Sequence, residues 1–209
     1  MKLQLALDTF TLEESIELLN QVNEYIDIIE VGTPFIIEDG LIPVRKFKEL
    51  YPNCEVLADV KIMDGGEYEA EKCFNAGADI ATVLGAAHNE TILGTIKAAR
   101  KYNKKIMVDM INVKDIRLRV KEIDEMGVDY ICVHTAFDVQ NSGANPLEEL
   151  KIINDILINA KSAVAGGLKL ATIPTVVKEG AEIIVVGGGI SNAKDKIKMC
   201  QDIKELMKK

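Results

Sequence analysis

The segment VLADVKIMDGGEYEAEKCFNAGADIATVL, residues 56–84, contains the unit that decides the fold. It consists of a short apolar run, a polar stop with glycine, an amphipathic stretch and a second apolar run. Runs that are short, rich in Val and Ile, and barely alternating are typical of parallel strands buried on both faces. The segment therefore predicts a strand, a helix and a second, parallel strand.

The same unit recurs along the whole chain of 209 residues. The apolar runs are residues 3–7, 26–31, 56–60, 80–84, 106–110, 130–133, 163–165 and 183–186. Between the ends of the first and eighth runs, each repeat takes roughly 26 residues, enough for a strand, a helix and two short loops. Eight such units predict a single (β/α)8 TIM barrel over residues 1–209. No GxGxxG motif follows the first run, which argues against an open dinucleotide-binding sheet.

Helical periodicity follows the first run. Leu12, Ile16 and Leu19 recur at helical spacing, and Thr11 followed by Glu14 predicts a capping box at the start of this helix.

The composition excludes several classes of protein. The net charge of −8 argues against a nucleic-acid-binding surface, because phosphate backbones need clustered Lys and Arg. No segment approaches the ~20 apolar residues of a membrane span, and the apolar start is too short for a signal peptide. We expect a soluble, cytoplasmic protein. Its cysteines lack zinc-like spacing and are expected to be reduced and mostly buried thiols: Cys54, Cys73, Cys132 and Cys200.

Charged residues follow the predicted strands at the end where barrel enzymes form their active sites. After strands one, two, three, five and six stand Asp8, Glu30, the group Asp59, Lys61 and Asp64, Asp109, and His134. The fourth strand, which ends near Thr82, offers no obvious chemical group. Any one of these residues alone could be a helix cap or a solvated loop residue. Several carboxylates buried in one mouth, however, cost on the order of several kcal/mol per uncompensated ion. We expect Lys61 and a divalent metal to balance them.

The Asp59, Lys61 and Asp64 motif predicts a protonated lysine. Residues two apart on an extended strand share a face, and carboxylates beside an ammonium favour its charged form. Such a lysine can stabilise an enolate oxygen or donate a proton to it; a surface salt bridge is the alternative, because D-x-K alone is a weak pattern. Glu30 and Asp59 end neighbouring strands and could share one Mg²⁺, although either carboxylate could instead bond to the neighbouring loop.

His134 and two glycine clusters complete the predicted site. His134 suits an acid or base working near neutral pH, with a structural role as the alternative, whereas His88 is interpreted as a solvated loop residue. Glycine N–H groups can approach a phosphate closely, and phosphate-binding barrels use the loops after strands seven and eight. Tight turns alone are the alternative for these glycines: Gly166, Gly167, Gly188 and Gly189.

Several motifs carry a resemblance to a known family. The sequence resembles the orotidine-phosphate-decarboxylase superfamily at LALD (5–8), DIIEVGTP (27–34), LADVKIMD (57–64) and VDMINV (108–113). It is similar, more narrowly, to the 3-hexulose-6-phosphate synthase family at YICVHTAFDVQ (130–140), AVAGGLKL (163–170) and VVGGGI (185–190). The resemblance covers essentially the whole chain.

This resemblance implies a Mg²⁺-dependent aldolase that joins formaldehyde to D-ribulose 5-phosphate through a cis-enediolate, giving 3-hexulose 6-phosphate. It also implies a homodimer in which Asp64 reaches the neighbouring subunit's site. The implied roles are metal binding by Glu30 and Asp59, enediolate stabilisation by Lys61, proton shuttling by His134, orientation of substrate hydroxyls by Asp8 and Asp109, and phosphate binding by the four glycines named above. The physiological direction of the reaction stays open.

Three positions separate this chain from the related 3-keto-L-gulonate-6-phosphate decarboxylases. These enzymes typically carry glutamate at the place of Asp109, and arginine at the places of Phe137 and Gly189. Loss of the arginine at Phe137 would leave a more apolar pocket that suits formaldehyde. The resemblance therefore favours the synthase; the decarboxylase and a non-catalytic sugar-phosphate-binding protein are the alternatives.

Overall fold

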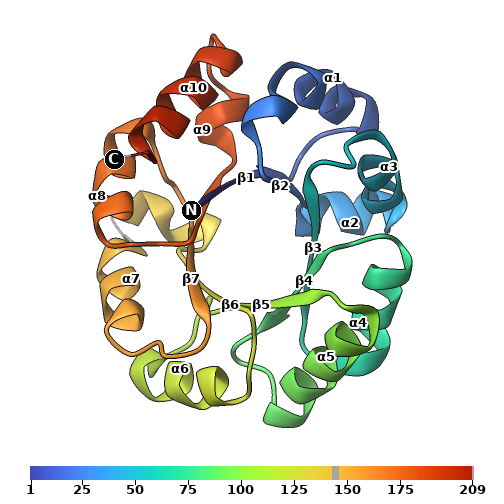
Figure 1. Cartoon of the computed structure of the whole chain (residues 1–209), viewed down its shortest axis with the longest axis vertical. Helices are drawn as coiled ribbons and strands as arrows, with labels where there is room; N and C mark the ends of the chain where they lie inside the picture. The colour runs from blue at the N-terminus through green and yellow to red at the C-terminus, as the bar shows by residue number, and fades with distance from the viewer. Residues whose placement is uncertain (143–145, 209) are drawn as a thin grey trace.

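The computed structural model describes residues 1–142 and 146–208; residues 143–145 and 209 of the predicted domain lie outside this description. Eight parallel strands form a closed barrel in chain order, and helices surround it (Figure 1). The strands are β1 (Lys2–Leu7), β2 (Ile28–Val31), β3 (Glu55–Ile62), β4 (Ile80–Leu84), β5 (Lys105–Asp109), β6 (Tyr130–His134), β7 (Lys161–Ala165) and β8 (Ile183–Val186). The predicted (β/α)8 barrel is therefore confirmed.

The helices follow the strands around the outside of the barrel (Figure 1). The α-helices are α1 (Leu12–Val22), α2 (Thr33–Asp39), α3 (Ile42–Leu50), α4 (Gly66–Asn75), α5 (Asn89–Tyr102), α6 (Ile116–Glu125), α7 (Pro146–Asn154), α8 (Ile173–Lys178), α9 (Gly188–Ser191) and α10 (Lys196–Leu206). Short 3-10 segments are η1 (Asn23–Tyr25), η2 (Phe137–Ser142) and η3 (Leu170–Thr172). At the start of α1, Thr11 and Glu14 form the predicted capping box.

The core has two layers, as the two buried faces of each strand require. The larger layer packs the outward faces of the strands against the helices. The smaller layer fills the barrel with inward-facing side chains, among them Ile28, Leu57, Met107 and Ile183. The interior is therefore a packed plug that separates the two ends of the barrel.

The predicted cysteine environment is confirmed. All four cysteines are free and buried. No helix within the described residues is long and apolar enough to cross a membrane.

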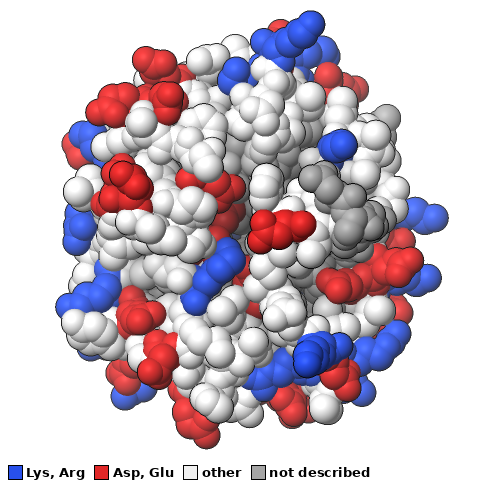
Figure 2. Space-filling view, turned by 180° about the vertical axis from the view of Figure 1, so that it is seen from behind, with Lys and Arg blue, Asp and Glu red and all other residues white. Residues whose placement is uncertain are grey.

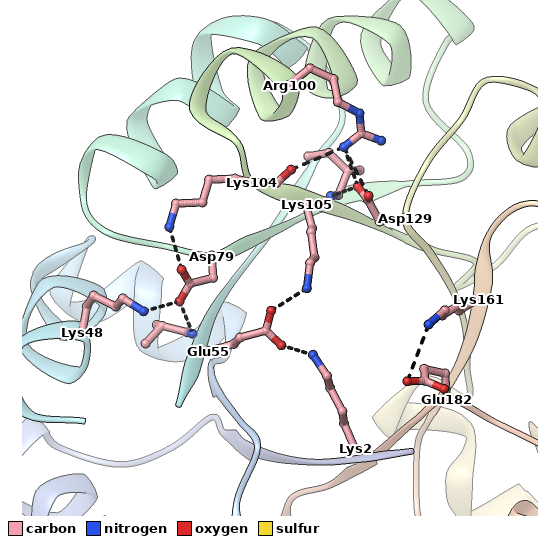
Figure 3. A network of polar contacts seen from close by, with 12 residues as sticks. Lys2, Lys48, Glu55, Asp79, Arg100, Lys104, Lys105, Asp129, Lys161 and Glu182 are labelled. Atoms are coloured by element: carbon pink, nitrogen blue, oxygen red, sulfur yellow. Dashed lines mark hydrogen bonds and ion pairs between the residues drawn. The ribbon is translucent and has the colours of Figure 1, made fainter. Parts of the chain in front are cut away.

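Several strands begin one or two residues earlier than the apolar runs predict, at charged residues. The first residues of β1, β3 and β5 are Lys2, Glu55 and Lys105. Their side chains meet at the end of the barrel where strands start: Glu55 binds the ammonium of Lys2 and, at 2.6 Å, that of Lys105 (Figure 3). Charged residues can begin these strands because their ion pairs offset the free-energy cost of removing them from water.

Candidate active site

The opposite end of the barrel carries the predicted site. Figure 1 views the barrel from the end where the strands begin, so Figure 2 shows the face where they finish. Acidic side chains lie around the middle of that face (Figure 2). Three further carboxylates are buried at this end of the barrel: those of Glu30, Asp59 and Asp109. The structure therefore brings together three of the predicted acidic residues.

The end of β3 is not the regular extended strand expected from the sequence. Ala58 pairs with Ala81 and Ile62 with Val83, so that residues 59–61 lie opposite Thr82 alone. Lys61 has a φ of 49°, a left-handed conformation that costs a non-glycine residue about 1–3 kcal/mol. The expectation that Asp59 and Lys61 meet is confirmed, but a bulge and a strained backbone bring them together, not strand alternation.

Lys61 is surrounded by carboxylates. Its ammonium pairs with Asp59 Oδ2 and lies 3.5 Å from Asp109 Oδ2. Burial by itself lowers the pKa of Lys61, but the negative charges of Asp59 and Asp109 outweigh burial and raise the pKa above its ordinary value. The lysine is therefore held protonated, as predicted, although its second carboxylate is Asp109 and not Asp64.

Asp109 also holds His134. Asp109 Oδ2 lies 2.9 Å from His134 Nδ1, and Asp109 Oδ1 accepts the Ile111 N–H at 2.9 Å. Burial raises the pKa of Asp109, but the His134 hydrogen bond, with the charge of Lys61, outweighs burial and lowers it. The carboxylate fixes the imidazole through Nδ1, which leaves Nε2 for a proton transfer.

Glu30 lies deeper in the same mouth. Gln4 Nε2 donates to Glu30 Oε2 at 2.7 Å, and Gln4 Oε1 is a buried oxygen without a hydrogen-bond partner. Burial first, and then the charge of Asp59, raises the pKa of Glu30 well above its ordinary value. The described side chains thus supply too little positive charge to favour the ionised form of Glu30.

Asp8 is exposed at the end of β1 and lies close enough to Asp59 for their charges to interact. Partial desolvation and the charge of Asp59 raise its pKa. A Cβ on Gly32 would come 2.8 Å from the Leu7 carbonyl oxygen, so the close approach of the two backbones here requires glycine.

The carboxylates can be tested against the predicted metal. No group of three or more His, Cys, Asp or Glu among the described residues could hold a metal ion. Mg²⁺, however, usually binds proteins through one or two carboxylates and completes its shell with water and substrate oxygens. Glu30 and Asp59 supply two oxygen donors of the right chemistry, and a bound cation would favour the ionised form of Glu30, which burial and Asp59 disfavour. The donor set fits a hard divalent ion.

Asp64 lies away from this cluster. It is exposed on the loop after β3, where its Oδ1 accepts the Gly65 N–H at 2.7 Å. None of its described contacts involves Lys61. Within one chain, the D-x-K-x-x-D motif is therefore split between the barrel mouth and the outer surface.

Three site residues have no predicted role. Thr82 Oγ1 donates to Asp59 Oδ1 at 2.8 Å and accepts the Lys61 N–H at 2.9 Å. Thr33 Oγ1 donates to the Asp59 carbonyl at 2.7 Å. Gln4 holds Glu30. The expectation that strand four offers no chemical group is therefore wrong, because its hydroxyl contacts two of the predicted residues.

The predicted phosphate-binding glycines lie in the loops after β7 and β8. Gly166 and Gly167 have φ values of 101° and 67°, and a Cβ on Gly166 would come 2.4 Å from the Thr135 carbonyl oxygen. Gly188 and Gly189 begin α9, and a Cβ on Gly189 would come 3.1 Å from the Leu168 carbonyl oxygen. The loops after β7 and β8 are therefore neighbours.

His88 and Phe137, the two other residues interpreted from the sequence, are both exposed, but only His88 was expected to be. His88 is exposed at the start of α5, as expected of a solvated residue. Phe137 is 83% exposed, so within one chain it does not form the apolar pocket expected at its position.

Known proteins share this sequence and architecture. Residues 1–203 match the model of the orotidine 5'-phosphate decarboxylase / HUMPS family. A 3-hexulose-6-phosphate synthase of Bacillus subtilis is 53% identical over 207 residues, covering 99% of each chain. The crystal structure of 3-hexulose-6-phosphate synthase from Salmonella typhimurium has a TM-score of 0.97 at 42% identity and covers 99% of this chain and 98% of that one.

A more distant structure shares the fold alone. The 3-keto-L-gulonate-6-phosphate decarboxylase of Vibrio cholerae has a TM-score of 0.85 at 24% identity, covering 99% of this chain and 97% of the other. The chain thus belongs to the orotidine 5'-phosphate decarboxylase / HUMPS family, and within it to the 3-hexulose-6-phosphate synthases, which are lyases.

Proposed function

We propose that this enzyme is a Mg²⁺-dependent aldolase that condenses formaldehyde with D-ribulose 5-phosphate through a cis-enediolate, giving 3-hexulose 6-phosphate. The observation that carries the proposal is the pairing of a protonated Lys61 with an Asp109-bound His134 in one mouth. This pair offers a positive charge for an enolate oxygen beside a group that can move a proton. The similarity to named synthases supports the choice of substrates.

The proposed chemistry assigns one step to each residue. His134 removes the proton from the carbon beside the ketose carbonyl, and Lys61 stabilises the oxyanion that develops. The nucleophilic carbon of the enediolate attacks the formaldehyde carbon and forms the new C–C bond. His134 returns its proton to the resulting alkoxide, so protons balance over the cycle. Asp109 keeps the imidazole oriented throughout.

Mg²⁺ would be held by Glu30 and Asp59. When bound, it would supply positive charge that acidifies the C–H bond beside the carbonyl. Asp8 would orient substrate hydroxyls at the rim. The N–H groups of Gly166, Gly167, Gly188 and Gly189 would bind the phosphate, which places the sugar chain across the mouth between the two sides of the barrel.

We further propose that the enzyme is a homodimer in which Asp64 completes the partner's site. Asp64 is exposed, and exposed apolar side chains flank it: Met63 and Tyr68 along the chain, and Leu93 on α5, which packs against α4. Large exposed apolar side chains gathered in one area are typical of protein–protein interfaces. The free, buried thiols support a reducing compartment such as the cytoplasm.

The proposal is tested by mixing the purified enzyme with ribulose 5-phosphate, formaldehyde and Mg²⁺ and measuring the loss of formaldehyde, with and without EDTA. We expect loss of formaldehyde that stops when EDTA removes the metal. Consumption that EDTA leaves unchanged would contradict the metal. Release of CO₂ from 3-keto-L-gulonate 6-phosphate without formaldehyde consumption would identify the decarboxylase instead. Absence of both activities would favour a sugar-phosphate-binding protein.

A further inference from the structure

The irregular end of β3 depends on one buried hydroxyl. Residues 59–61 lie opposite the single residue Thr82, because the pairing of β3 with β4 stops at Ala58 and resumes at Ile62. A backbone N–H inside this bulge has no regular strand partner. The Lys61 N–H instead donates to Thr82 Oγ1 at 2.9 Å. The hydroxyl thus replaces a carbonyl of the ladder.

The same hydroxyl also contacts a carboxylate of the candidate active site. Having accepted the Lys61 N–H, Thr82 Oγ1 donates its own hydrogen to Asp59 Oδ1 at 2.8 Å. The other carboxylate oxygen of Asp59 binds the Lys61 ammonium. A closed circuit therefore runs from the Lys61 backbone through Thr82 and Asp59 to the Lys61 side chain. Thr82 is 3% exposed, so water does not compete for these hydrogen bonds.

We propose that Thr82 is a positioning residue: its hydroxyl holds Lys61 in its left-handed conformation and fixes the Asp59 carboxylate, and so aims the ammonium at the substrate. This inference rests on the proposed function for its chemical meaning, since Lys61 is the group it positions. Thr82 itself touches no reacting atom in this scheme. A hydroxyl that serves as both donor and acceptor is required, and valine, although similar in shape, can do neither.

Paired variants separate the hydroxyl from the packing of the side chain. Thr82→Val keeps the shape and removes the hydroxyl, whereas Thr82→Ser keeps the hydroxyl and removes the methyl group. Thr95 offers the matched control, because it is fully buried in α5 and its hydroxyl donates only to the Ile92 carbonyl at 2.7 Å. Thr95→Val therefore removes a buried hydroxyl away from the site.

The first experiment measures kcat and KM separately for ribulose 5-phosphate at saturating formaldehyde and Mg²⁺. We expect Thr82→Val to lower kcat about 10- to 100-fold, as loss of a group that orients a catalytic side chain does, with little change in KM. The KM is spared because the phosphate is held by the β7 and β8 loops. Thr82→Ser should recover most of the lost kcat. A Thr82→Val enzyme as fast as Thr95→Val, or a Thr82→Ser enzyme as slow as Thr82→Val, would overturn the inference.

The second readout does not depend on the reaction. Amide hydrogen exchange at Lys61, followed by NMR, should be slow in the wild type and in Thr82→Ser and faster in Thr82→Val, with Thr95→Val like the wild type. Equal exchange at Lys61 in all four proteins would contradict the positioning role. If the wild type consumes no formaldehyde, the proposed function fails, and this exchange measurement still decides whether Thr82 holds the Lys61 backbone.

Discussion

The two ends of the barrel use charge in opposite ways. At the end where strands begin, the network drawn in Figure 3 contains six cations and four carboxylates: Lys2, Lys48, Arg100, Lys104, Lys105 and Lys161 against Glu55, Asp79, Asp129 and Glu182. At the end where strands finish, Asp8, Glu30, Asp59 and Asp109 have Lys61 as their cationic partner among the described contacts, and His134 shares a hydrogen bond with Asp109. Cations outnumber carboxylates at the first end, and carboxylates outnumber cations at the second.

The pKa shifts record this difference. At the first end, burial of Glu55 and Asp79 raises their pKa values, but hydrogen bonds from lysines outweigh burial and lower them. At the second end, burial and neighbouring carboxylates raise the pKa values of Glu30 and Asp8. Paired charges stabilise the folded chain, whereas carboxylates without cationic partners fit the proposed metal and substrate. The barrel therefore keeps its paired charges and its proposed site at separate ends.

The largest effect is expected from removing Lys61, the cation of the proposed active site. Lys61→Ala should lower kcat by at least about 10²–10³-fold, because the developing oxyanion loses its charged partner. Formaldehyde consumption measures the loss, and circular dichroism checks that the fold persists. Lys198→Ala removes an exposed lysine paired with Asp202 on α10 and serves as the control. Normal turnover by Lys61→Ala would contradict the role of this end of the barrel.

Metal binding should stabilise the functional end. At a Mg²⁺ concentration of 100 times Kd, the folded state would gain about 2.7 kcal/mol, or roughly 5–10 °C in Tm. EDTA should reverse the shift. Glu30→Gln should abolish it, since an amide is a poor substitute for a carboxylate on Mg²⁺, while Glu55→Gln should keep it. An equal Mg²⁺ shift in Glu30→Gln would place the ion elsewhere.

Loss of a carboxylate at the opposite end should affect stability and spare catalysis. Glu55→Gln leaves Lys2 and Lys105 without their shared partner, and we expect a loss of about 1–2 kcal/mol in the free energy of unfolding because the pair is only partly buried. The kcat at 25 °C should stay at the wild-type value. Glu49→Gln, in an exposed pair with Lys46, should change stability by less than about 0.5 kcal/mol and provides the control. A large loss of kcat in Glu55→Gln would show that the two ends are coupled.

The same contrast explains what the sequence could predict. Contiguous apolar runs located all eight strands, and the charged residues directly after them included the cluster of Glu30, Asp59, Lys61, Asp109 and His134 in the barrel mouth. Lys2, Glu55 and Lys105 fell outside the predicted runs because periodicity cannot show that charges at strand starts find partners. Thr82 was missed because a hydroxyl inside an apolar run has no distinctive pattern, and the bulge that gives it a role depends on pairing between β3 and β4. The proposed role of Asp64 rests on the family resemblance alone, because its described contacts lie within its own loop.

Acid should weaken the ion pairs of Glu55 at the end of the barrel where strands begin. The folded-state pKa of Glu55 lies below its ordinary value of 4.5, so the stability it contributes is fully present above pH 4.5 and is lost as the pH falls through the lowered value. The difference in unfolding free energy between wild type and Glu55→Gln, measured in urea, should therefore be largest from pH 7 to 5 and shrink toward pH 3. The difference for Glu49→Gln should stay near zero throughout. A Glu55→Gln difference that is constant with pH would mean that Glu55 stabilises the barrel through packing, and that the ion network at this end contributes no net charge stabilisation.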